Sequence, residues 1–131
     1  MATQTLNVTK TSGFYSAAEL KLDAVSSLTK TADLAADISG AGDFFYAVVD
    51  IPEDSTGTYT LTFNAGDFND GGKNIPVSLT AEKLNIVPFT SLEAKNFNGK
   101  VSLTLATDNV LGLAALGVSV GIVAHSSVVN H

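Results

Sequence analysis

Alternation of apolar and polar residues dominates the middle of the chain and predicts half-buried strands. In TYTLTF at 58–63, the apolar Tyr59, Leu61 and Phe63 alternate with threonines, and KVSLTLA at 100–106 repeats the pattern with valine and leucines. A period of two places all apolar side chains on one face of a strand. We therefore expect two antiparallel strands, each with one buried face and one face in water.

Two other segments are apolar in both phases of a strand, FFYAVVDI at 44–51 and GVSVGIVAH at 117–125. Such strands are covered on both faces, by the core or by a neighbouring subunit, so we expect them to be central. Weaker strand signals occur at 3–9, 75–80 and 83–89. The last two contain proline, which favours strand starts, edges or bulges.

Segments rich in Gly, Asn and Asp separate these strands, such as NDGGKN and NFNGK. These residues tolerate the positive φ of tight turns. About seven strands joined by such turns predict a mainly β chain. The expected fold is a single domain over 1–131, an antiparallel β-sandwich or jelly-roll-like barrel with one or two short helices, and residues 1–12 are a candidate extended arm.

Residues 15–39 do not follow the strand pattern and leave helix and strand open. SAAELKLDAVSSL contains a capping box formed by Ser16 and Glu19, and Leu22 and Val25 continue a helical spacing. The leucines and alanine of LKLDA alternate as in a strand. We favour a short helix.

The most apolar run is VLGLAALGVSVGIVA at 110–124. It is shorter than the roughly 20 residues that a membrane helix needs, and we interpret it as buried core. A helix starting at Asp108 is a further expectation, weakened by Gly112, and Thr90 and Glu93 offer a one-turn cap.

Composition excludes several chemistries. The chain of 131 residues is 45% apolar and 15% charged, so we expect a globular domain. Cysteine is absent, which excludes disulfides and thiolate metal sites. Thirteen acidic residues outnumber seven basic ones, all lysine, for a net charge of −6. Without the guanidinium fork of arginine, and with this charge, we expect no nucleic-acid partner.

The first residues, MATQTLNVTKTSGFY, contain no basic region followed by an apolar stretch, so no secretory signal is predicted. We expect synthesis in the cytoplasm and no membrane partner.

Residues 117–121 match the G-x-S-x-G pattern of a hydrolase nucleophile, with Ser119 at its centre. The pattern requires a strand-to-helix turn, yet β-branched residues continue the strand and no acidic residue follows Ser119. His125 would have to reach back along the same strand. We therefore predict that the protein is not an enzyme.

Asp67, Asn69 and Asp70 in DFNDGG provide oxygen ligands on a turn, the donors that calcium prefers. The segment lacks the remaining ligands of an EF-hand, so a solvated hairpin turn is the main interpretation and an irregular calcium site is the alternative. No other cofactor site is predicted. Tryptophan is absent and the three tyrosines are assigned to strands or core, which does not favour sugar stacking.

The tetrapeptide AGDF occurs at 41–44 and at 65–68, each time followed by Ile-Pro at the same offset. FYAVVD separates the first pair and predicts a strand, whereas NDGGKN separates the second and predicts a turn, so the two are not a structural repeat. We interpret them as shared turn chemistry, with Phe44 and Phe68 anchoring the chain.

The chain is short, acidic, free of Cys, Trp and Arg, rich in Thr, Ala, Ser and Gly, and ends in the apolar LGVSVGIVAHSSVVNH. In this general character it resembles the small virion proteins of tailed bacteriophages, in particular capsid decoration (cement) proteins. The resemblance implies a non-enzymatic protein made in the host cytoplasm and located in the virion. Its partners would be the major capsid protein on the outside of an assembled head, which it would stiffen, or copies of itself.

Leu6, Val8, Val128 and Val129 are candidate contact residues, because they are apolar and lie near the termini, outside the densest strands. Two other classes stay open. A tail-tube or other virion subunit would polymerise, and a carbohydrate-binding or adhesive sandwich needs an aromatic surface. The strand at 117–125 is either internal or paired across subunits, since an exposed apolar edge invites aggregation.

Overall fold

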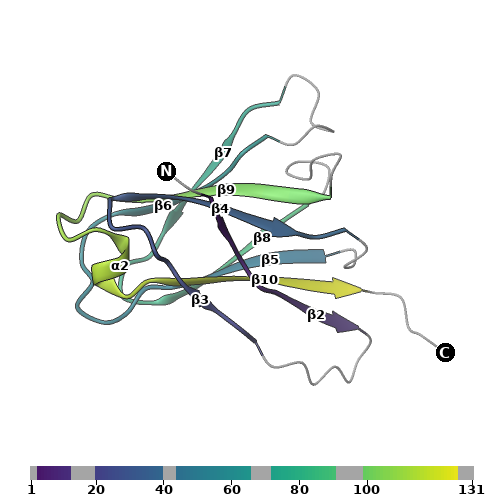
Figure 1. Cartoon of the computed structure of the whole chain (residues 1–131), viewed down its shortest axis with the longest axis horizontal. Coiled ribbons are helices and arrows are strands. Elements are labelled where there is room, and N and C mark those ends of the chain that lie inside the picture. Colours follow the sequence, from purple (N-terminus) through teal and green to yellow (C-terminus); the bar gives the residue numbers. More distant parts are fainter. Residues whose placement is uncertain (1–2, 13–19, 40–43, 66–71, 91–98, 127–131) are drawn as a thin grey trace.

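The computed structural model describes residues 3–12, 20–39, 44–65, 72–90 and 99–126. In this part of the chain, ten strands form two sheets that pack face to face (Figure 1). Sheet A has the order β1 (Gln4–Thr5), β4 (Thr31–Asp37), β9 (Lys100–Thr107), β6 (Tyr59–Phe63) and β7 (Ile75–Leu79). Sheet B has the order β2 (Val8–Ser12), β10 (Ser119–Ser126), β5 (Phe44–Asp50) and β8 (Leu84–Phe89), and β3 (Asp23–Ala24) also pairs with β10.

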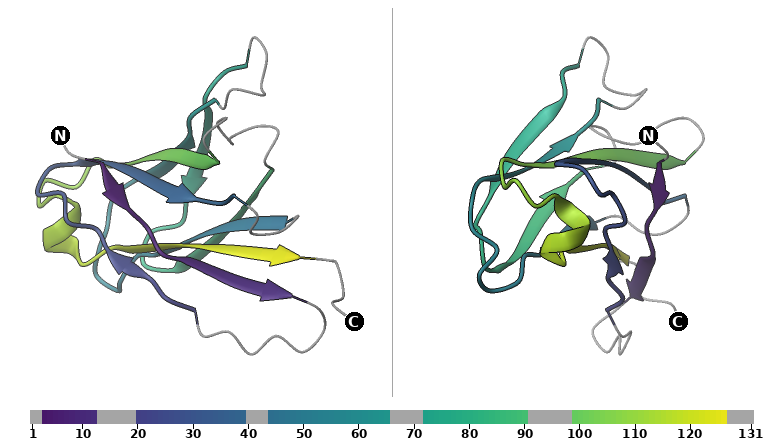
Figure 2. Two further views of the ribbon diagram at one scale, coloured as in Figure 1. Left: turned by 45° about the vertical axis from the view of Figure 1, so that its right-hand side comes forward. Right: turned by 60° about the vertical axis from the view of Figure 1, so that its left-hand side comes forward.

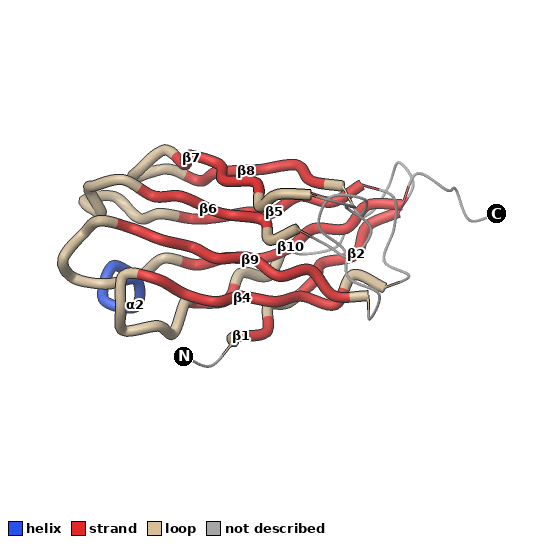
Figure 3. The backbone as a smooth tube through the Cα atoms, turned by 90° about the horizontal axis from the view of Figure 1, so that it is seen from above, coloured by secondary structure: helices blue, strands red, loops and turns tan. Residues whose placement is uncertain are grey.

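The antiparallel strand pairs nest inside one another along the chain. β3 pairs with β10, β4 with β9, β5 with β8 and β6 with β7, so each strand meets its counterpart from the other end of the sequence. The nested pairs together form one long hairpin. The hairpin folds over on itself, because β10 also pairs with β5, and β9 also pairs with β6 (Figure 3). These eight strands, four in each sheet, have the strand order of a jelly roll, and β1 and β2 add a parallel strand to each sheet. The predicted mainly β sandwich is therefore confirmed.

The single strand predicted at 3–9 is in fact two short strands in different sheets. β1 pairs parallel with β4 in sheet A, and β2 pairs parallel with β10 in sheet B. At the crossing, Asn7 donates from its backbone (2.6 Å) and from its side chain (2.7 Å) to the Asp23 carboxylate. The candidate arm over 1–12 is therefore, where described, part of both sheets.

The core lies between the sheets and follows the predicted alternation. Tyr59, Leu61 and Phe63 of β6 are all buried. The ring centroid of Phe89 lies 5.4 Å from that of Phe45 and 4.9 Å from that of Phe63, so one aromatic cluster joins the two sheets. Aromatic pairs at such distances contribute roughly 0.5–1.5 kcal/mol beyond the burial of their surface.

The favoured helix within residues 15–39 is wrong for the part that the structure describes. Residues 20–28 contain no helix, and β3 and β4 occupy this region. The inner face of β4 buries two alanines and Leu34. This alternation is a strand signal, but alanine and aspartate have low strand propensity, and pairing with β9 along the whole strand overrides that preference. Ser16 and Glu19 lie outside the described residues.

Within the described residues, the one helix is α2 (Leu113–Leu116), at one end of the sandwich (Figure 2). It begins after Gly112, which has a positive φ of 82°, and not at Asp108 as expected. Gly117 ends it in the left-handed conformation, with φ 77°. The residues of the cap predicted near 90–97 lie, apart from Thr90, outside the described part.

β10 is a central strand, as its apolar pattern predicts, and its outer face is crossed at one position. The described side chains of its inward face, Val120, Ile122 and Ala124, are fully buried in the core. On the outer face, a Cβ added at Gly121 would lie 2.6 Å from the Lys21 carbonyl oxygen and 2.9 Å from Leu22 Cδ2. Residues 21–22 therefore cross the outer face of β10 at the one position of the strand that has no side chain.

Replacing Gly121 with alanine should destabilise the fold by about 1–3 kcal/mol, because the added methyl group meets backbone and overpacks the crossing. Urea unfolding measures the change. Ser119→Ala, on the same face of the same strand, is the matched control and should shift stability by less than about 0.5 kcal/mol. Unchanged stability of Gly121→Ala would show that the crossing does not constrain this strand.

Candidate interaction site

The two outer faces of the sandwich differ in chemistry. The outward residues of sheet A are small and polar, and cross-strand pairing places Asp33, Thr104 and Thr62 in one row. The outward residues of sheet B are mostly apolar, and the corresponding row contains Val48 and Ile86 beside Gly121. Of the two outer faces, that of sheet A is therefore polar and that of sheet B is mostly apolar.

A groove of about 360 Å³ lies on the outer face of sheet B, and we call it the sheet-B groove. It is lined by Thr9, Leu20, Tyr46, Val48, Leu84, Ile86 and Val123. One wall is formed by the segment around residues 21–22, which crosses the outer face of β10. The backbone N–H of Lys21 donates to Thr9 Oγ1 (3.3 Å) and holds this segment beside β2. The edge strand β8 forms the other wall, with Leu84 54% and Ile86 62% exposed.

A second hollow, of about 280 Å³, continues the apolar face toward the start of β5. Its lining includes Phe44, Pro88 and Tyr46, and Tyr46 is shared with the sheet-B groove. Phe44 is 51% exposed, so its predicted role as an anchor of the chain is wrong and its ring is presented to solvent. Together the two hollows make a continuous apolar strip along β5 and β8.

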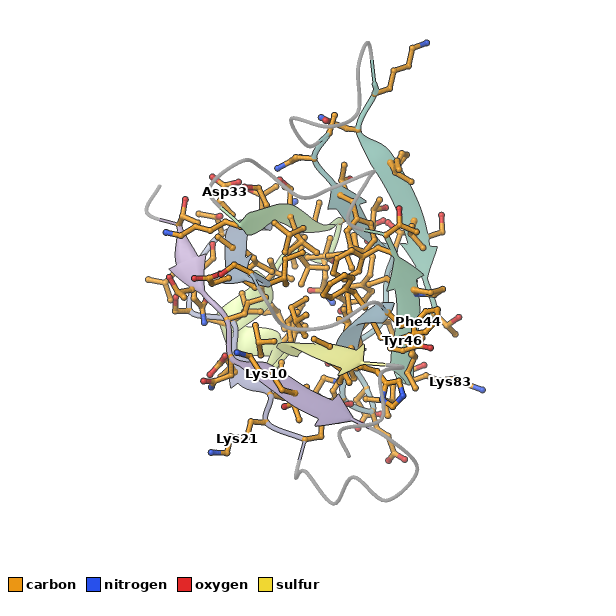
Figure 4. The ribbon with its side chains drawn as sticks, turned by 90° about the vertical axis from the view of Figure 1, so that its right-hand side faces the viewer. Lys10, Lys21, Asp33, Phe44, Tyr46 and Lys83 are labelled. Carbon is orange, nitrogen blue, oxygen red and sulfur yellow. The ribbon has the colours of Figure 1, made fainter. Side chains whose placement is uncertain are left out.

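Lysines flank the sheet-B groove. Lys21 lies at the β2 side of sheet B and Lys83 at the β8 side, with Phe44 and Tyr46 on β5 (Figure 4). Asp50 is the last outward-facing residue of β5. It pairs with Leu84 of β8 at one end of the strip. The groove therefore has an apolar floor, and its rim carries both signs of charge, since Glu82 adjoins Lys83 and accepts the backbone N–H of Asp54.

Three highly exposed apolar residues lie in two neighbouring loops at the α2 end of the sandwich. Leu28 is 84%, Val110 84% and Leu111 62% exposed, and we call these three residues the apolar tip. Their loops are held together by the backbone, because Leu113 N–H donates to the Thr29 carbonyl at 2.9 Å. A Cβ at Gly112 would lie 2.6 Å from the Leu28 carbonyl oxygen, so this close approach requires glycine.

The apolar tip departs from the sequence prediction. Val110 and Leu111 belong to the run at 110–124 that is expected to be core, and burial begins only at Leu113. Leucine and valine between turn residues, as in SSLTK and DNVLG, are the signal that could have identified the tip.

Asp108 and its neighbour Asn109 form hydrogen bonds with the loop at residues 56–58. Asp108 Oδ1 accepts the backbone N–H of Thr58 at 2.8 Å, and the side chain of Asn109 donates to the Thr56 carbonyl at 3.0 Å. The hydrogen bond from the Thr58 backbone lowers the pKa of the Asp108 carboxyl below its usual 3.8. The ionised carboxylate is therefore a structural part of this end of the molecule.

The candidate contact residues near the termini do not form one surface in the described part. Leu6 is 4% exposed and belongs to the core, so its side chain is not offered to a partner. Val8 is half-buried and packs against the core. Val128 and Val129 lie outside the described residues.

The structure keeps the serine and histidine of the G-x-S-x-G segment apart. Ser119 begins β10 and pairs with Asp50, whereas His125 pairs with Phe44 near the other end of the strand. Six residues of strand at about 3.3 Å each separate them by roughly 20 Å, too far for proton transfer. They do not form a catalytic dyad.

The described residues contain no group of three or more His, Asp or Glu side chains that could hold a metal ion. The candidate calcium ligands Asp67, Asn69 and Asp70 lie outside this part of the chain. Among the helices of the described ranges, none has the length and apolarity to cross a membrane.

Comparison of the chain with protein-family models, with curated proteins and with solved structures finds no match. The surfaces of the described residues that could bind a partner are the sheet-B groove and the apolar tip.

The stability of the protein should depend on pH through Asp108. Because its pKa in the folded state is below 3.8, its contribution is present at neutral pH and is lost as the pH falls through that lower value. Asp108→Asn should lower the melting temperature at neutral pH and have less effect in strong acid. Asp33→Asn, exposed on β4, is the control and should change the melting temperature little. A difference in melting temperature between the Asp108→Asn variant and the parent that stays constant across the acid range would contradict this role.

Proposed function

We propose that this protein is a non-enzymatic structural protein of a virion, a decoration protein that binds the outer surface of an assembled phage head and stabilises it. The observation that carries the proposal is the one-sided surface of the sandwich. Sheet A presents threonine, serine and aspartate to water, whereas sheet B presents Leu84, Ile86 and Phe44. Large apolar residues clustered on one face are typical of a protein-binding surface.

Charge supports the outer surface of the head as the location. A protein of net charge −6 without arginine is repelled by packaged DNA, whereas the outside of a shell imposes no such cost. The jelly-roll strand order is also common among capsid domains, although the same fold serves many other functions.

A carbohydrate-binding sandwich has less support, because the sheet-B groove is lined almost entirely by apolar side chains. A sugar site needs polar groups that fix hydroxyls as well as an aromatic platform. Thr9 and Tyr46 supply the hydroxyl groups of this groove, and Thr9 already accepts the Lys21 N–H.

Capsid binding can be tested with heads assembled from the major capsid protein encoded in the same genome. The purified chain should co-sediment with these heads and add density to their outer surface in electron cryo-microscopy. Phe44→Ser should weaken binding about fivefold, since half of a phenylalanine side chain contributes roughly 1 kcal/mol when it is buried.

The matched control is Thr62→Ser on the outer face of sheet A, which should bind like the parent. Absence of the protein from the sedimented heads, or density confined to their interior, would contradict the proposed function.

A further inference from the structure

The two edges of the sandwich differ in how completely they are covered. At one edge, the N-terminal segment adds β1 to sheet A and β2 to sheet B, and Leu6 between these strands is buried. At the other edge, β7 and β8 end the two sheets (Figure 3). The inward apolar residues of β7 are only half-buried there, although they pack against the core: Ile75, Val77 and Leu79. An extended segment therefore closes one side of the core, and the opposite side is less completely covered.

The backbone of β8 directs alternate residues away from sheet B. The backbone N–H of Ile51 donates to the Lys83 carbonyl at 3.1 Å, so position 83 faces β5. Because successive residues of a strand face opposite neighbours, the N–H and C=O groups of Leu84 and Ile86 point away from β5. Pro88 has the same outward phase, where a missing N–H costs no bond to β5. Among the described strands β5 is the one neighbour of β8 along this path, which leaves the outward groups of Leu84 and Ile86 available to a further strand.

The edge of β7 is less suited to a further strand. The backbone N–H of Asn64 donates to the Ser102 carbonyl at 3.0 Å, so even-numbered residues of β6 face β9 and odd-numbered residues face β7. The outward phase of β7 therefore contains Pro76, which has no N–H to donate. At the end of β7, the Asn85 side chain bonds the N–H and C=O groups of Thr80, at 2.8 and 2.9 Å. Of the two neighbouring edges, β8 is the one that can extend its sheet.

A strand added to β8 would meet apolar surface on both of its faces. On the outer face of sheet B, Leu84 is 54% and Ile86 62% exposed. On the inner side, the half-buried Val77 of β7 lies at the uncovered edge of the core. An extended segment with apolar side chains in both phases would cover these surfaces while its backbone pairs with β8.

We propose that an extended segment of the major capsid protein adds to β8 as a further strand of sheet B. This inference rests on the proposed function, which supplies the partner, and it specifies the contact as main-chain hydrogen bonds along β8. Alternate side chains of the added segment pack against Ile86 and Val77. The β8 strand of a second copy does not fit, because its inward Val87 and Phe89 are already buried in their own core.

The backbone contact can be tested at position 86. Ile86→Pro removes the outward N–H and places ring atoms in the path of the added strand, while the bonds to β5 are kept, as at Pro88. In co-sedimentation with assembled heads, binding should be at least about tenfold weaker for Ile86→Pro and at most about threefold weaker for Ile86→Val. Valine has as many side-chain carbons as proline but keeps the N–H.

The matched control is Ser78→Pro, the same substitution in the outward phase of β7, which should bind like the parent. Thermal unfolding checks that each variant folds.

Two measurements on the parent chain are independent of the variants. In hydrogen exchange, the backbone amides of Leu84 and Ile86 should exchange rapidly in the free protein and become protected on the heads. In an electron cryo-microscopy map of decorated heads, extended density should run beside β8 at about 4.8 Å, the spacing of paired strands.

An Ile86→Pro variant that folds and binds like the parent overturns the inference. Amides of Leu84 and Ile86 that are already protected in the free protein overturn it as well, as do decorated heads with no strand beside β8. None of these results contradicts capsid binding itself. Heads that carry none of the protein overturn the proposed function, and this inference with it.

Discussion

The fold depends on β10, a strand that pairs with three others and packs its inner face in the core. β2, β3 and β5 all bond to it, and it closes the nested hairpin that starts at β3. Core side chains fill its inner face, and residues 21–22 cross its outer face at Gly121. An apolar strand of this kind at an edge would recruit other chains, so its central position also protects the monomer from aggregation.

The crossing over β10 has a consequence for the surface. The crossing segment lies on one side of the outer face of sheet B, and the exposed Leu84 and Ile86 of β8 lie on the other side. The sheet-B groove is the hollow between them. The opposite sheet is polar throughout its central rows. This division suits a molecule that lies between water and a protein assembly, which links the fold to the proposed role.

Individual elements show where sequence reasoning succeeds. β6 and β9 were predictable because bulky apolar residues alternate with threonine and serine, and each strand has one face in the core. β4 has the same period but uses alanine and aspartate, so local propensity is too weak to identify it. The helix favoured near Leu22 is absent from the described residues because that segment packs as a crossing over Gly121, a contact with a residue far along the chain.

The sequence by itself determined the mainly β class, the central strands and the absence of thiol and guanidinium chemistry, because period and composition are local properties. The tertiary structure alone decided where the apolar surfaces lie. The sheet-B groove joins Leu20, Tyr46 and Ile86 from separate segments, and the backbone of Leu28 meets Gly112, two residues after Val110. A period of two shows which side chains share a face of a strand, but whether that face is covered depends on pairing between residues distant in sequence.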